Sequence, residues 1–295
     1  MAKQPKKIER PGVAEVPDPL SGENLKSLAL RLGLPLLGIW VLGLLIAGVS
    51  ETTWVRYTAI GFPALLTVAA IGLIAWTVRQ AGKMRGVASI LGSVESAEDR
   101  KAAIEKLDSK GNDPMALFAK AQLVMQEDPR AALAVLEQID LGKVMASVAD
   151  EARGQRAMIH LMLGDVTPAR DLADGIDLSR HQDTKTKAML AAVTAEAWAR
   201  TGLTQRAQNT LDIFNPEDEI LAPVRPQLHR ARAFICANTG DIKAMRRALR
   251  KLADQDARLL AGFMMKKTHP LLQKEAKKML EQSGQMPRKM MVQRS

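Results

Sequence analysis

Four histidines, one cysteine and a few spaced carboxylates are the residues of this chain that could carry acid–base, nucleophilic or metal chemistry. The histidines are dispersed along the sequence: His160, His181, His229 and His269. His160 lies between Ile159 and Leu161, on an apolar helical stretch where a core or groove histidine is a far stronger interpretation than a catalytic one. The histidines therefore do not indicate a shared site.

The cysteine and the acidic residues do not indicate a shared site either. Cys236 has no second cysteine for a disulfide or a metal-ligand pair, and we expect it to be a small buried hydrophobe. Asp171, Asp174 and Asp177 recur every third residue, which could form a divalent-cation site, but a solvated helix face is the favoured interpretation. Phosphate loops, dinucleotide fingerprints and nucleophile elbows are missing. We predict no catalytic, cofactor or metal residue and no enzymatic activity; an enzyme with an unrecognised site is the weakest of three hypotheses.

The elements that would position any site are helices. Of 295 residues only 3% are aromatic, and Ala, Leu, Met, Lys, Arg and Glu dominate. These are strong helix formers, whereas strand-preferring residues with alternating polarity are lacking over residues 80–290. The sequence predicts an all-α fold.

Two uncharged stretches, residues 32–50 and 57–78, each approach the roughly 20 residues that a transmembrane helix needs. Buried core helices, or a signal peptide for the first stretch, are the alternatives. We expect two spans joined by the loop 51–56, with Gly43 and Ala47 permitting close helix contact. The absence of charge within the spans favours an anchor over an ion pathway.

Basic residues flank the two stretches on the sides away from the loop: Lys26, Arg31, Arg79, Lys83 and Arg85. By the positive-inside rule, both termini and the later residues lie in the cytoplasm, so the chain is a two-pass protein of the plasma (inner) membrane. The remaining flanking segments are expected as a disordered tail (1–20), a short interfacial helix capped by Ser21 (21–31), linker helices (79–112) and a basic tail (285–295).

A period of 38 residues recurs four times over residues 113–254. Turn glycines mark it at Gly164, Gly202 and Gly240, and small residues precede each turn position by seven residues: Ala119, Ala157, Ala195 and Ala233. Glycine permits the left-handed backbone at a helix end, and alanine lets two helices approach closely. Each repeat is therefore predicted to be a pair of helices. The expected helix caps are Asp113, Asp128, Thr167, Thr204 and Asp241.

The repeats resemble the tetratricopeptide-repeat (TPR) family, most closely in Ala157 to Ala169 (AMIHLMLGDVTPA) and Ala195 to Ala207 (AEAWARTGLTQRA). Trp198 takes the family's aromatic position in the first helix. The resemblance covers residues 113–254 and implies an α-solenoid of TPR-like helix pairs, which residues 255–284 would close as a capping pair with Thr268 as cap and Gly284 as stop. The plan of two spans and cytoplasmic repeats is similar to that of bacterial HemY-type membrane proteins, which is a likeness of architecture and implies no function.

The resemblance also implies a concave groove lined by side chains of the first helices. Its partner-binding residues would be Lys120, Met158, Glu196, Arg200, Arg230, Phe234 and Asn238. The basic and asparagine set with which such proteins clamp a peptide carboxylate is not reproduced. Our preferred hypothesis is a membrane-anchored scaffold that presents this groove to a protein partner or holds a membrane complex together.

The charge of the chain supports a second hypothesis. Net charge is +10, and residues 225–295 contain 17 Lys and Arg against 5 Asp and Glu. Such a basic end can attract anionic lipid or nucleic acid, and its densest cluster is Arg246, Arg247, Arg250 and Lys251. Nucleic acid is the weaker of these two partners, because aromatic residues for stacking are nearly absent.

Overall fold

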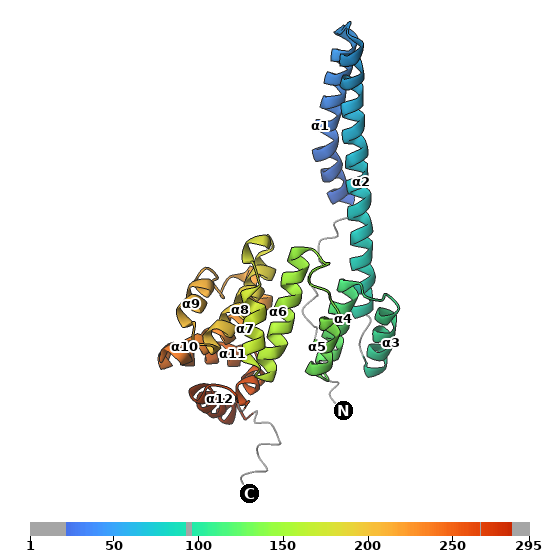
Figure 1. Cartoon of the computed structure of the whole chain (residues 1–295). Coiled ribbons are helices and arrows are strands. Elements are labelled where there is room, and N and C mark those ends of the chain that lie inside the picture. Colours follow the sequence, from blue (N-terminus) through green and yellow to red (C-terminus); the bar gives the residue numbers. More distant parts are fainter. Residues whose placement is uncertain (1–21, 93–95, 266, 285–295) are drawn as a thin grey trace, which may run out of the picture. The chain divides into compact units, whose positions relative to one another are not determined.

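The computed structural model describes residues 22–92, 96–265 and 267–284, and these residues form helices without any strand (Figure 1). This confirms the all-α class. The chain divides after Gly92 into two compact units. The expected tail 1–20, the Ser21 cap and the basic tail 285–295 lie outside the described residues.

The first unit consists of α1 (Gly22–Val49) and α2 (Thr53–Gly92). Because α1 is uninterrupted, the expected short helix 21–31 and the first apolar stretch belong to one element. Within the described residues, Thr53–Gly72 of α2 is long and apolar enough to cross a membrane, whereas the apolar part of α1, Gly33–Val49, is shorter. One candidate span is therefore found, and the second span and the orientation remain predictions.

Large apolar side chains of both helices are exposed instead of packed into a core: Leu34, Leu37, Val41, Leu42, Leu44, Leu45, Ile46, Val49, Trp54, Tyr57, Ile60, Phe62, Leu65, Val68 and Ile71. What is buried in this unit lies between its two helices. A Cβ added at Gly43 would collide with the carbonyl oxygen of Ala59, so the expected close contact at Gly43 is confirmed. The indole N–H of Trp40 donates to the Thr67 hydroxyl of the other helix at 3.0 Å. The pair thus satisfies these polar groups internally, as an apolar surrounding requires.

The second unit begins with α3 (Ala97–Asp108), which Ser96 caps by accepting from the Asp99 amide. Four helix pairs follow: α4 (Pro114–Met125) with α5 (Pro129–Glu137), α6 (Ala146–Leu163) with α7 (Val166–Asp174), α8 (Thr184–Arg200) with α9 (Thr204–Asp212), and α10 (Arg225–Thr239) with α11 (Ile242–Gln255). The helices of each pair pack on each other, and α8 also packs on α6 and α10. The four predicted helix pairs are present; their TPR-like solenoid arrangement remains a prediction.

Glycine and alanine play the predicted parts in these pairs. Gly164, Gly202 and Gly240 have φ of 83°, 90° and 78°, values that side-chain-bearing residues rarely adopt. The alanines seven residues before each turn are at most 3% exposed: Ala119, Ala157, Ala195 and Ala233. The helices of each pair therefore approach closely where the repeat pattern placed small residues.

The caps were predicted only in part. Asp113, Asp128 and Asp241 accept from backbone amides at helix starts, as expected. Thr167 and Thr204 do not cap, because α7 and α9 begin at Val166 and at Thr204 itself. In each case the helix restarts two residues after the turn glycine, which leaves both threonines inside the helix.

Two of the connections between pairs contain a short helix of their own. The segment after α7 contains the 3₁₀ helix η1 (Leu178–Arg180), and the segment after α9 contains η2 (Glu219–Val224). The sequence pattern did not reveal these two short helices. The closing pair is η3 (Ala257–Met264), a 3₁₀ helix, and α12 (Pro270–Ser283). His269 caps α12 instead of Thr268, and Gly284 ends it with a φ of 68°.

Candidate functional site

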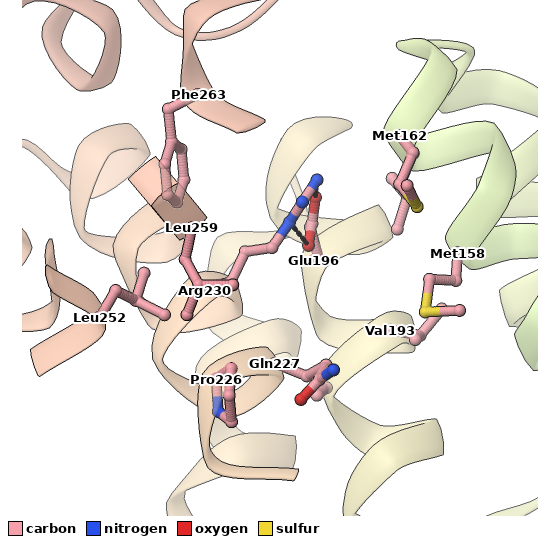
Figure 2. A pocket seen from close by; sticks show the side chains of 12 residues that line it. Met158, Met162, Val193, Glu196, Pro226, Gln227, Arg230, Leu252, Leu259 and Phe263 are labelled. Carbon is pink, nitrogen blue, oxygen red and sulfur yellow. Dashed lines mark hydrogen bonds and ion pairs between the residues drawn. The ribbon is translucent and has the colours of Figure 1, made fainter. Parts of the chain in front are cut away.

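The first helices of the four pairs line two cavities. One, of about 150 Å³, is bounded by Met158 and Met162 of α6, by Val193 and Glu196 of α8, and by residues of α10, α11 and η3 (Figure 2). The other, of about 410 Å³, lies between α4, α5, α6 and α8. Met158 and Val193 line both cavities, so the two cavities adjoin, and we call them together the inner groove.

The inner groove is mainly apolar and rich in methionine. Met125, Met158, Met162 and Met189 contribute thioether side chains, each half-buried. Unbranched methionine side chains adjust their shape at little cost and suit surfaces that accept apolar partners. Of the sequence-predicted partner residues, Met158, Glu196 and Arg230 line the groove.

Glu196 is the centre of a buried ion cluster. Its side chain is only 6% exposed, and its carboxylate accepts from the Arg230 guanidinium at 2.9 and 3.1 Å (Figure 2). Arg200, one helical turn further along α8, donates to the same carboxylate at 3.2 Å and to the Leu161 carbonyl of α6 at 2.8 Å. The cluster therefore ties α6, α8 and α10 together.

In this cluster, burial and the charge of Glu196 shift the pKa values of the two arginines in opposite directions. Burial would lower the pKa of Arg230, but the attraction of Glu196 and its hydrogen bonds outweigh it and raise that pKa. Burial lowers the pKa of Arg200 despite Glu196, and the charge of Arg230 lowers it further. Because two guanidiniums share one carboxylate, an excess positive charge remains beside the groove.

Phe234 differs from its predicted role. It is 1% exposed, its ring lies 5.4 Å from that of Phe263, and Arg200 lies 4.8 Å from its centroid. It is therefore a core residue beneath the ion cluster, and a partner in the groove would not reach it. The helix-wheel position placed it in the groove row, but η3, whose packing the repeat pattern did not foresee, covers it.

The outer members of the predicted set lie elsewhere. Lys120 pairs with Asp108 of α3 instead of standing free on the groove wall. Asn238 is exposed and donates to the Phe234 carbonyl of its own helix at 2.9 Å. The structure thus brings together Glu196, Arg200, Arg230 and Phe234. Lys120 and the exposed Asn238 side chain do not line the inner groove.

The predicted basic cluster is partly neutralised. Arg246 pairs with Glu275 of α12 at 2.7 Å, and Lys251 pairs with Glu217 at 3.0 Å. Arg247 and Arg250 are exposed and form no ion pair with any described residue. Their guanidiniums remain available to a partner.

The residues considered for chemistry stay dispersed. The part of the chain that the structure describes has no group of three His, Cys, Asp or Glu side chains that could hold a metal ion. Asp174 instead accepts from the Trp198 indole at 2.7 Å and pairs with Arg170. His229 and Cys236 line a third cavity, of about 370 Å³, on the side of α10 that faces α9 and α11. Burial and the charge of Arg232 lower the pKa of His229 to about 4, and burial raises the pKa of the Cys236 thiol, so both are neutral at pH 7.

Asp150 is a structural site that the sequence did not reveal. It is fully buried, and its carboxylate accepts from Arg153 at 2.9 Å and from Arg180 at 3.3 Å, with His181 at 3.7 Å. It thereby fastens the segment that contains η1 to α6. The sequence gives no sign that Asp150 is buried, because charged residues are seldom buried unless paired, and of its partners only Arg153 is near in sequence, whereas Arg180 lies 30 residues away.

Comparisons with protein-family models, with curated proteins and with solved structures gave no match. The similarity of the repeats to the TPR family therefore remains a prediction from the residues quoted above.

Proposed function

We propose that this chain is a membrane-anchored scaffold that binds a protein partner in the inner groove. The observation that carries the proposal is the groove itself, a methionine-rich depression shared by α6 and α8. An apolar segment of a partner would bury its side chains against these methionines, and the excess positive charge of the Glu196 cluster would favour a partner without basic residues at that end. The four helix pairs would then form a TPR-like solenoid.

Anchorage would come from the first unit. The proposal has both α1 and α2 crossing the plasma (inner) membrane, with both termini and the second unit in the cytoplasm. Exposed apolar side chains along both helices and the polar contacts closed between them support this arrangement. Arg56 supports it too, since its guanidinium donates to the Ala47 and Ser50 carbonyls at the end of α1, at 3.1 and 2.8 Å.

Site-specific photo-crosslinking tests the groove. A photoreactive residue placed at Met162 of the full-length chain in native membranes should give one crosslinked protein, identified by mass spectrometry. The matched control position is Ile213, an apolar residue that is 67% exposed and does not line the groove. The Met189→Lys substitution at the other end of the groove should abolish the Met162 crosslink. Equal crosslinks from Met162 and Ile213, unaffected by Met189→Lys, would refute groove recognition.

A further inference from the structure

The outer sides of α11 and α12 carry a dense set of basic residues. On α11 the side toward the core holds Met245, Leu249 and Leu252, and the opposite side is exposed. The two helices together contain eight Lys and Arg against three Asp and Glu. We call their exposed basic residues the basic face: Lys243, Arg246, Arg247, Arg250, Lys274, Lys277 and Lys278.

One carboxylate shows that the two helices contribute to the same surface. Glu275 of α12 accepts from Arg246 of α11 at 2.9 and 2.7 Å. The hydrogen bond from Arg246 is the main cause that lowers the pKa of Glu275, and the charges of Lys274 and Lys278 lower it further. Basic groups of both helices therefore surround a single acid.

Most of this charge has no acidic partner among the residues that the structure describes. Apart from Arg246, the members of the basic face form no ion pair with any residue in the described ranges. Lys251, which the sequence grouped with them, is excluded because it pairs with Glu217. The surface needs an external anion to balance it.

We infer that the basic face binds the anionic lipid headgroups of the bilayer that holds the first unit. This inference rests on the proposed membrane anchorage. Guanidinium and ammonium groups suit phosphate, and neither helix contains an aromatic residue that could stack on nucleic-acid bases.

The basic face belongs to a unit that is covalently tethered to the candidate span. The candidate span ends at Gly72 and α2 continues to Gly92, a helical length of about 30 Å. The second unit follows directly, so it is held at a high effective concentration relative to the bilayer surface. Each basic residue at an anionic surface contributes about 1 kcal/mol, a factor of about five in association.

The test uses the full chain in lipid nanodiscs made either of phosphatidylcholine alone or with about one-third phosphatidylglycerol. A donor dye is placed at Gln282→Cys in a Cys236→Ser background, and the acceptor is on the lipid headgroups. Energy transfer should be higher in the anionic discs and should fall to the phosphatidylcholine level at high salt. The variant Lys274→Glu/Lys277→Glu/Lys278→Glu should weaken the association with anionic lipid more than about a hundredfold and so abolish the difference in energy transfer.

The matched control makes the same change of charge on α3 and the turn that follows it, with Lys101→Glu/Lys106→Glu/Lys110→Glu, and should keep the high transfer. Transfer that is equal in both lipids, while the chain still co-elutes with the discs, would overturn the inference alone. A chain that leaves the discs would overturn the anchorage on which the inference rests. Binding of duplex DNA through the same three lysines, without any response to lipid charge, would reassign the basic face to nucleic acid.

Discussion

Replacing Glu196 by alanine should destabilise the second unit strongly, because it removes the one acid shared by Arg200 and Arg230. The Arg200 side chain is only 7% exposed and would keep the Leu161 carbonyl as its sole hydrogen-bond partner, whereas Arg230, at 25%, could regain water. Breaking a buried ion pair from one side costs about 3–5 kcal/mol, and we take about 3 kcal/mol since Arg230 is partly exposed. At about 2–4 °C per kcal/mol, Tm should fall by about 6–12 °C.

The assay is thermal unfolding of the fragment 93–295, followed by circular dichroism. This fragment contains the hydrophobic clusters around Trp198, Leu136 and Leu161 in full. The triple variant Glu196→Leu/Arg200→Met/Arg230→Met should regain part of the lost stability, because apolar side chains then replace the whole ion cluster and no buried charge is left unpaired. If Glu196→Ala lowers the Tm by less than about 2 °C, Glu196 does not stabilise the fold in this way, and a role in partner binding would be the better explanation.

Three further changes follow from the same structure. Gly202→Ala should lower the Tm of the fragment 93–295 by about 2–4 °C, because a side chain at a φ of 90° costs about 1 kcal/mol; no neighbouring atom would clash, so this is the whole effect. Gly202→Asn should lower the Tm less. His229 has a pKa of about 4 in the folded chain against 6.5 for the free side chain, so its contribution to the free energy of unfolding is complete above pH 6.5 and is lost as the pH falls toward 4. Urea titrations should show this decline in stability, and His229→Gln should remove much of the pH dependence. Gly43→Leu should separate α1 from α2 at Ala59 and break the Trp40–Thr67 hydrogen bond, and the fluorescence emission of Trp40, with the other three tryptophans replaced by Phe, should then shift. Gly48→Leu, which has open space, should leave that emission unchanged.

The helix pairs could be predicted because their signals are local. A glycine with positive φ, an aspartate before a proline and a buried alanine each act through residues a few positions away, so periodicity in the sequence reveals them. The predictions of the threonine caps were wrong because only one residue separates Gly164 or Gly202 from the next helix, so that helix has already started at Thr167 or Thr204.

The candidate site could be predicted less well. The helical period correctly placed Met158 and Glu196 on the side of the first helices that lines the inner groove. It could not show that Glu196 would meet Arg230, 34 residues later, or that Phe263 would pack on Phe234. The first contact depends on how α10 packs on α8, and the second depends on how η3 folds back onto α10. No periodic pattern encodes either step.

The sequence by itself determined the helical class, the positions of the four pairs, the apolar first unit and the basic character of the chain's end. Propensity, turn chemistry and charge are properties of residues and of their near neighbours, which is why they can be read without coordinates. Only the tertiary structure decided which charges remain free. Arg230 and Arg246 are paired with the carboxylates of Glu196 and Glu275, whereas Arg247, Arg250 and the lysines of α12 form no ion pair with a described residue. An ion pair forms only where folding brings two distant side chains within a few ångströms.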